Sequence, residues 1–210
     1  MATADLPATR TPTLLEVLPD GYPIGRILLR PVPGTATDAD LESIHRREDR
    51  LCELVDGTLV DKTTGSHESN LTARLIYALM CFAEPRQLGE FLGPDGMIRF
   101  APGQVRLPDI AFYRRERLPG GTLPRQAILD LIPDLVVEIL SEGNTRAEMD
   151  RKLAKYFAAG VRLAWYADPR RREVAVSEAV DRVVVRDESA TLDGGAVLPG
   201  FTLRVGDWLR

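Results

Sequence analysis

The run Leu135–Leu140, which reads Leu-Val-Val-Glu-Ile-Leu, constrains the fold more than any other feature of the chain. Its length and branched apolar residues predict a strand that is buried on both faces. An unpaired carboxylate inside such a strand costs several kcal/mol. The charge of Glu138 must therefore be compensated by a metal ion, by a cation from a neighbouring element, or by both. The sequence offers partners for each case: Asp109 opens an earlier apolar strand, and Lys152 lies on the helix expected after Glu138.

The size and composition of the chain predict one domain. With 210 residues, of which 44% are hydrophobic and 28% charged, the chain is long enough for one substantial core and short for two. We interpret residues 1–36, rich in proline and threonine, as an irregular N-terminal arm, and residues 37–210 as a single domain. The longest apolar stretch, Leu75–Ala83, is far below the roughly 20 residues needed to cross a bilayer, and the N-terminus lacks the apolar segment of a signal peptide. We expect a soluble, cytoplasmic protein in which Cys52 and Cys81 are buried, reduced thiols.

The net charge of −4 is mild evidence against a protein that coats nucleic acid. An enzyme that contacts a few phosphates remains allowed, because phosphate binding depends on local basic clusters. Three such clusters occur, at Arg46, Arg47 and Arg50, at Arg114, Arg115 and Arg117, and at Arg170 to Arg172. Each of them is equally compatible with a solvated surface.

Periodicity and turn residues predict strands and helices in mixed order. Asp56-Gly57 suits the tight turn of a hairpin between strands at 51–55 and 58–60. Helices are expected from Thr37 or Asp38 to Arg47, from Ser66 to Pro85, and from the capping region that ends at Thr145 to about Ala159, followed by Gly160. Further strands are expected near 88–92, 97–101, 109–113, 135–140, 161–167, 173–176 and 183–185. This order predicts an α/β fold, a mixed sheet with helices packed on it.

Two acids are candidates to share a metal ion with each other. Asp134 lies on the strand of Glu138, and four residues at about 3.3 Å each separate them by roughly 13 Å, too far for one ion. Asp109 opens a different strand, and neighbouring strands lie about 4.8 Å apart, so Asp109 and Glu138 can converge on one cation. The alternative is that Asp109 caps a turn while Glu138 pairs with an arginine.

Lys152 is the lysine best placed to reach Glu138. On a helical wheel it flanks the apolar stripe of its helix, whereas Arg151 and Lys155 point toward solvent. Lys152 could position or deprotonate an attacking water beside a bound Mg²⁺, which acts as a Lewis acid. Alternatively, Lys152 extends its charged end from a packed stem to solvent. Glu53 alternates with apolar neighbours on the first hairpin strand, a pattern more typical of a solvent face, and His45 and His67 are too isolated to form a metal site.

Five stretches of the chain, in this order, resemble the Uma-two family of putative restriction endonucleases, which is assigned to the PD-(D/E)XK nuclease superfamily. The stretches are Glu53-Leu54-Val55-Asp56-Gly57, Pro108-Asp109-Ile110, Pro133 to Ser141, Asp150-Arg151-Lys152-Leu153 with Tyr156, and Gly160-Val161 with Trp165 and Asp168-Pro169. The resemblance covers roughly Leu41 to the C-terminus. It implies a restriction-endonuclease-like core, a central mixed β-sheet flanked by helices, with the acids on two adjacent central strands.

The resemblance also implies roles for individual residues. Asp109 and Glu138 would be the metal ligands, and Glu53 an additional acid in the same cleft. In the superfamily, the lysine usually follows the acidic ligand by two residues, and Leu140 holds that position here. The resemblance to the Uma-two family implies that the lysine is instead on the following helix, at Lys152. His67 stands where similar proteins often carry a histidine. The sequence departs from its relatives at residues 162–164, where a proline, a glutamate and an aromatic residue are typical.

These implications define one function and two alternatives. The first is an endodeoxyribonuclease, dependent on Mg²⁺ or Mn²⁺, that hydrolyses DNA phosphodiester bonds with a metal-activated water, in which Asp109 and Glu138 hold the ion, Lys152 orients the water and Glu53 assists. A homodimer is expected from the resemblance. The second is a catalytically silent nuclease-fold module that binds DNA or regulates. The third is a metal-free scaffold in which Glu138 is salt-bridged to Lys152.

Overall fold

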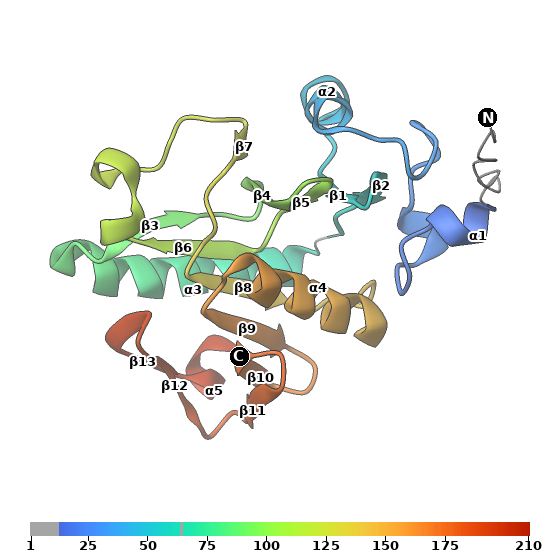
Figure 1. Cartoon of the computed structure of the whole chain (residues 1–210). Helices are drawn as coiled ribbons and strands as arrows, with labels where there is room; N and C mark the ends of the chain where they lie inside the picture. The colour runs from blue at the N-terminus through green and yellow to red at the C-terminus, as the bar shows by residue number, and fades with distance from the viewer. Residues whose placement is uncertain (1–12, 64) are drawn as a thin grey trace, which may run out of the picture.

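The computed structural model describes residues 13–63 and 65–210, which form two main β-sheets with helices packed against them. The helical segments are α1 (Leu14–Val17), η1 (Ile24–Arg26), α2 (Asp38–Glu48), α3 (Ser66–Ala83), η2 (Glu84–Arg86), η3 (Arg115–Arg117), η4 (Pro119–Gly121), α4 (Arg146–Ala159) and α5 (Val205–Trp208). The strands are β1 (Cys52–Val55), β2 (Thr58–Asp61), β3 (Gly89–Leu92), β4 (Met97–Ala101), β5 (Gln104–Arg106), β6 (Ile110–Arg114), β7 (Ile128–Leu129), β8 (Leu135–Ile139), β9 (Leu163–Asp168), β10 (Glu173–Ala179), β11 (Arg182–Arg186), β12 (Thr191–Gly194) and β13 (Leu198–Arg204). Figure 1 shows their arrangement along the chain.

The central six-stranded sheet has the order β11-β10-β9-β8-β6-β3 and is mixed, because β8 and β9 run parallel while the other neighbours are antiparallel. A five-stranded sheet, β2-β1-β5-β4-β7, carries the first hairpin, and β12 and β13 form a separate hairpin. The expected α/β class with a mixed sheet and packed helices is therefore present. A second sheet was not expected; it contains the first hairpin, because β1 pairs with β2 on one side and with β5 on the other.

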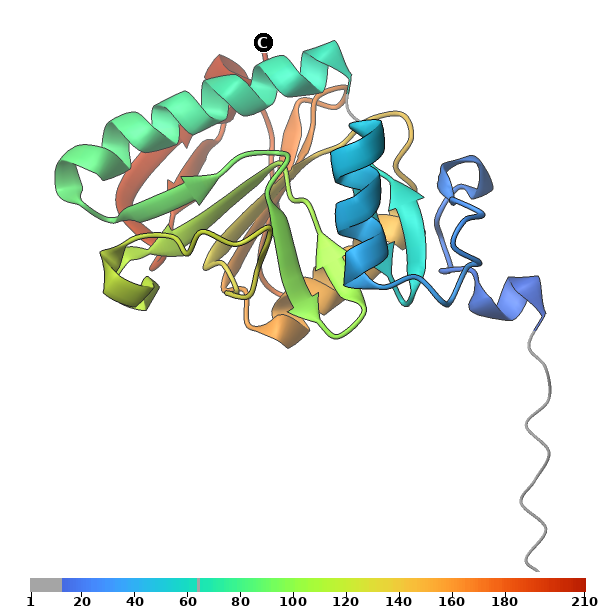
Figure 2. The same ribbon diagram turned by 90° about the horizontal axis from the view of Figure 1, so that it is seen from above.

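The two faces of the six-stranded sheet bury different helices. Alternate residues of β6, β8 and β9, such as Phe112, Val137 and Trp165, pack with α3 and the C-terminal segment. Their neighbours, such as Ala111, Val136 and Ala164, pack with α4. Figure 2 shows α3 on one side of the strands and α4 on the other. Both faces of β8 are consequently covered, as its apolar sequence predicts, and all five of its residues are buried.

Local signals explain why the helices begin and end where they do. Thr37 and Asp40 form a reciprocal capping box at the start of α2, and Thr145 and Glu148 form another at the start of α4. Gly160, with a φ of 110°, ends α4 in the left-handed conformation that glycine adopts without steric penalty. For α3 the cap is Gly65 rather than the expected Ser66, which is the first helical residue.

Several expectations need correction or extension. Cys52 is buried as expected, whereas Cys81 is exposed, because it lies on the side of α3 that faces away from the sheet. Strands β5, β7, β12 and β13 were not expected, nor was α5. Residues 1–12 of the expected arm lie outside the described residues, and residues 13–36 include α1 and η1. In the described segments, no helix combines the length and the apolar character that a membrane span requires.

Candidate active site

Asp109 and Glu138 come from adjacent strands and share one face of the sheet. In the antiparallel pair β6 and β8, Ile110 lies opposite Val137, so the next position along the register places Asp109 opposite Glu138. Cross-strand neighbours have Cβ atoms about 5 Å apart. The backbone N–H of Ile139 donates to Asp109 Oδ2 at 2.7 Å, which fixes the aspartate beside β8. Both acids are only 5% exposed, and their strand alternation directs them to the face that α4 covers.

Lys152 joins this face to the first hairpin. Its Nζ lies 2.9 Å from Glu138 Oε1 and 2.9 Å from Glu53 Oε1, so one ammonium bridges β8 and β1. One helical turn further along α4, the hydroxyl of Tyr156 donates to the same oxygen of Glu138. The helical wheel placed Lys152 on the flank of the apolar stripe, and the side chain is indeed buried, with 5% exposure. The alternative of a lysine that reaches solvent is wrong.

Glu53 is buried on a strand where a solvent-facing acid was the simpler interpretation, and that interpretation is wrong. Glu53 is 1% exposed. Arg106 Nη1 lies 3.3 Å from Glu53 Oε2, and the backbone N–H of Leu107 donates to Glu53 Oε1 at 3.2 Å. Arg106 in turn donates to the hydroxyl of Tyr22 at 2.8 Å. Both oxygens of Glu53 are therefore occupied, and the residue fixes Lys152 and Arg106.

Lys62, which the sequence did not single out, holds Asp109. Its Nζ lies 2.9 Å from Asp109 Oδ1 and donates to the carbonyls of Pro94 and Leu107 at 2.8 and 2.7 Å. Lys62 directly follows β2, where a lysine at the end of a hairpin gives no sign that it is buried. The one available signal was its proximity in sequence to the hairpin strand that carries Glu53.

The environment separates the pKa values of the two glutamates. Burial raises the pKa of Glu53, but the charges of Lys152 and Arg106 outweigh burial and lower that pKa to about 2. Burial also raises the pKa of Glu138, and the carboxylates of Asp109 and Glu53 raise it further against the opposing effect of Lys152. For Lys152, the two glutamates outweigh burial and raise the pKa, which keeps the ammonium charged. Burial and the neighbouring carboxylates thus disfavour the ionised form of Glu138, whereas the basic partners of Glu53 favour its ionised form.

The donor set of this pair fits a hard divalent cation. Asp109 and Glu138 supply carboxylate oxygens from the same face, and the pKa of Glu138 is raised by burial and by the neighbouring carboxylates. Mg²⁺ is typically bound through one or two carboxylates and keeps several waters. Within residues 13–63 and 65–210, no group of three or more His, Cys, Asp or Glu side chains is arranged to hold a metal. The chain thus offers a two-carboxylate site rather than a closed protein cage.

The other candidate residues lie apart from this cluster. Asp134, expected only to start its strand, is fully buried at the opposite end of β8, where it accepts from the backbone N–H of Arg114 at 3.0 Å and from Arg117 at 3.2 Å. His67 is exposed in the first turn of α3 and lines an open groove of about 690 Å³. Leu140, where the superfamily lysine usually stands, lines the same groove. His45 lies on α2.

Comparison with known proteins identifies the family. The family model described as "Uma2: Putative restriction endonuclease" matches residues 38–206, most of the chain. The chain belongs to the Uma2 family. The Uma2 match spans the hairpin with Glu53, the two strands with Asp109 and Glu138, and the helix with Lys152.

A solved structure supports the fold of this Uma2 protein. A putative nuclease belonging to DUF820 from Anabaena variabilis ATCC 29413 superposes with a TM-score of 0.67 and 19% sequence identity, and the match covers 77% of this chain and 93% of that chain. At this identity the likeness shows the fold. Comparison with curated proteins gave no match.

Proposed function

We propose that this Uma2 protein is a metal-dependent endodeoxyribonuclease with a restriction-endonuclease-like core, which hydrolyses DNA phosphodiester bonds. One arrangement carries the proposal: Asp109, directly before β6, accepts from the backbone N–H of Ile139 beside Glu138 on β8, and the ammonium of Lys152 lies 2.9 Å from Glu138. Two adjacent carboxylates with a fixed lysine can bind a cation, orient a water and stabilise the charge of a phosphate. Membership of the Uma2 family supports the same reaction class.

In this proposal, each residue has a role that its contacts allow. Asp109 and Glu138 would hold Mg²⁺ or Mn²⁺, and the bound ion would supply Lewis acidity and lower the pKa of a bound water. Lys152 orients the attacking water or a phosphate oxygen, since its raised pKa keeps it a charged donor. Glu53 is a positioning residue, because its two oxygens hold Lys152, Arg106 and the backbone of Leu107. In this role Glu53 assists through its neighbours and not as a direct ligand of the ion.

A silent nuclease-fold module that binds or regulates DNA is the second candidate. It is favoured by one observation, namely that Asp109, Glu138 and Glu53 each already contact a basic side chain. Because these basic side chains already neutralise the carboxylates, no metal ion is required to compensate their charge. The expected homodimer, which would present two sites to the two DNA strands, stays a prediction.

Plasmid nicking distinguishes the two candidates. Supercoiled plasmid is incubated with Mg²⁺ or Mn²⁺ and the wild type, Asp109→Asn or Lys152→Met. We expect metal-dependent nicking by the wild type, and a rate lower by about 100-fold or more in both variants, since positioned proton-transfer and charge-stabilising groups typically contribute at least that factor.

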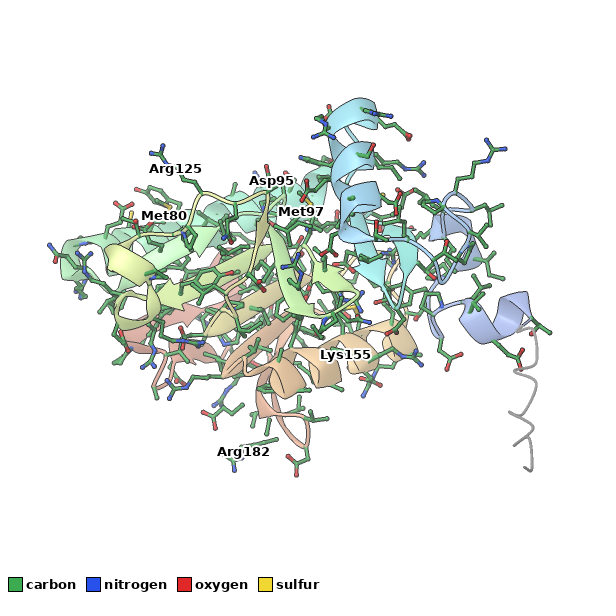
Figure 3. The ribbon with its side chains drawn as sticks, turned by 45° about the horizontal axis from the view of Figure 1, so that its top comes forward. Met80, Asp95, Met97, Arg125, Lys155 and Arg182 are labelled. Carbon is green, nitrogen blue, oxygen red and sulfur yellow. The ribbon has the colours of Figure 1, made fainter. Side chains whose placement is uncertain are left out.

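Matched controls are available on the surface. Asp95→Asn and Lys155→Met change the same residue types at exposed or half-exposed positions that Figure 3 labels, and both variants should nick at the wild-type rate. Circular dichroism confirms that each variant is folded. Retention of DNA without nicking in any metal would support the silent module, and nicking that survives Asp109→Asn would contradict the assigned site.

A further inference from the structure

Lys62 is a buried lysine whose hydrogen-bonding capacity is fully used. Its side chain is 7% exposed, and its ammonium contacts Asp109 Oδ1, the Pro94 carbonyl and the Leu107 carbonyl at 2.7 to 2.9 Å. An ammonium has three N–H donors and no acceptor, so three oxygen partners satisfy it completely. Lys62 is therefore held in one position and needs no water or further ligand.

A metal ion bound by Asp109 would compete with the ammonium of Lys62 for the Asp109 carboxylate. Asp109 Oδ2 is engaged by the backbone N–H of Ile139, and Oδ1 is engaged by Lys62. Each oxygen of Asp109 thus already has one partner, and an ion bound by either oxygen lies close enough to the ammonium of Lys62 to be repelled by its charge. The two carbonyl contacts of Lys62 remain available to it when the contact with Asp109 is weakened.

Charge in the cluster balances without a metal. The carboxylates of Glu53, Asp109 and Glu138 are matched by three basic groups, which are Lys62, Lys152 and Arg106. Buried charges are tolerated when they are paired and hydrogen-bonded, so this arrangement keeps the acids ordered before any cation arrives. Lys62 alone among the three basic groups contacts Asp109 in the described residues.

We propose that Lys62 is a resident counter-cation of Asp109, which orders this carboxylate in the metal-free protein and competes with the divalent ion, so that it sets the metal affinity of the site. The inference rests on the proposed function, because it takes Asp109 to be a metal ligand. A purely structural lysine that ties the β3–β4 turn to the β5–β6 connection would have no such effect on metal affinity. The sign of the change in affinity therefore separates the two roles.

Mn²⁺ binding to the full chain without DNA tests the proposal. Isothermal titration calorimetry compares the wild type with Lys62→Met, Lys62→Gln, Lys62→Arg and the control Lys155→Met. Removal of a unit positive charge next to a ligand strengthens cation binding, so we expect Lys62→Met and Lys62→Gln to bind Mn²⁺ about tenfold more tightly than the wild type. Lys62→Arg keeps the charge and should stay near the wild type, as should Lys155→Met.

Thermal unfolding supplies a second readout. Without metal, Lys62→Met should unfold at a lower temperature than the wild type, and saturating Mn²⁺ should raise its Tm by more than it raises the wild-type Tm. Lys62→Gln, whose amide still donates hydrogen bonds, carries the test if Lys62→Met does not fold. Equal or weaker Mn²⁺ binding by the folded neutral variants overturns the role of Lys62 and leaves the proposed function standing. Absence of Mn²⁺ binding by the wild type and every folded variant overturns both.

Discussion

Lys152 shares one ammonium between carboxylates that come from two different sheets. Glu53 lies on β1 of the five-stranded sheet and Glu138 on β8 of the six-stranded sheet, and Nζ is 2.9 Å from each. Buried ion pairs contribute little net stability compared with apolar packing, whereas loss of one partner is expensive. The arrangement is thus better suited to fixing the geometry of the acids than to stabilising the fold.

The lowered pKa of Glu53 makes a pH-dependent prediction. Its pKa is about 2 in the folded chain against an ordinary value of 4.5, so its ionised form stabilises the fold fully above pH 4.5, and this contribution is lost as the pH falls from about 4.5 to about 2. At about 1.4 kcal/mol per unit, the loss is about 3 kcal/mol. Between pH 4.5 and pH 2, we expect the free energy of unfolding of Glu53→Gln to fall by about 3 kcal/mol less than that of the wild type. Urea denaturation at each pH measures this difference.

An exposed glutamate serves as the control for this measurement. Glu90 is exposed on β3, so Glu90→Gln should follow the wild-type pH dependence. If Glu53→Gln and the wild type lost stability in parallel below pH 4.5, the ion pairs of Glu53 would not be responsible for its lowered pKa.

At the scale of elements, local signals account for what the sequence could predict. The first hairpin was predicted because Asp56 and Gly57 accept positive φ angles, which are 48° and 74°. Helices α2 and α4 were predicted from their caps and apolar spacing. Strands β5 and β7 have three and two residues, too few for an alternating pattern, and β13 contains a proline and a glycine that argue against a strand. β5 and β7 form through pairing with strands distant in sequence, β1 and β4 respectively, whereas β13 forms a hairpin with the preceding strand β12.

Contacts that form only through tertiary packing also escaped prediction in the candidate site. Strand spacing and the apolar run were enough to place Asp109 beside Glu138, as the register of β6 and β8 does, while their sharing of a metal ion stays a prediction. Lys62 and Arg106 were missed because a basic residue after a hairpin or on a short strand normally faces solvent, and only tertiary packing buries these two. Tyr156 is a buried residue of α4, and its hydroxyl bond to Glu138 depends on the packing of this helix against β8.

Helix α2 carries two adjacent exposed arginines that are available to DNA. Arg114 and Arg117 pair with Asp134, and each arginine from 170 to 172 pairs with a glutamate. Arg46 and Arg47, in the last turn of α2, are exposed and form no ion pair within the described part of the chain. Leu41 packs this helix against the hairpin strand that carries Glu53, so Arg46 and Arg47 lie on a helix that neighbours the candidate active site.

We therefore expect the double variant Arg46→Ala/Arg47→Ala to bind duplex DNA more weakly, by about tenfold at low salt, and to reduce the salt slope of log K by up to about two. Fluorescence anisotropy of a labelled duplex across a KCl series measures both quantities. The matched double variant Arg171→Ala/Arg172→Ala should have a smaller effect, because acids already neutralise those arginines. Equal losses in the two double variants would show that α2 has no special part in binding.

For the whole molecule, the N-terminal residues 13–36 are tied to the same helix that carries Lys152. Arg26 donates to Glu148 of α4 at 2.9 and 3.0 Å, to the carbonyl of Asp61 at 2.8 Å and to the carbonyl of Gly143 at 3.2 Å. Tyr22 contributes its hydroxyl to Arg106, which holds Glu53. The N-terminal segment therefore contacts Arg106, which holds Glu53 of the first hairpin, and Glu148 of helix α4.

Substitution of Arg26 tests whether this segment folds as one unit with the rest of the chain. Glu148 is fully buried, so Arg26→Met leaves an uncompensated carboxylate, a change that typically costs about 3–5 kcal/mol. Urea denaturation should show a single transition with that loss, whereas Arg125→Met, at an exposed arginine that Figure 3 labels, should change stability by less than about 0.5 kcal/mol. A loss as small as that of Arg125→Met would mean that residues 13–36 are an arm with no part in the cooperative core. The expected large loss would instead place the start of the domain before residue 37, since only a segment that unfolds together with α4 can contribute this energy to the global transition.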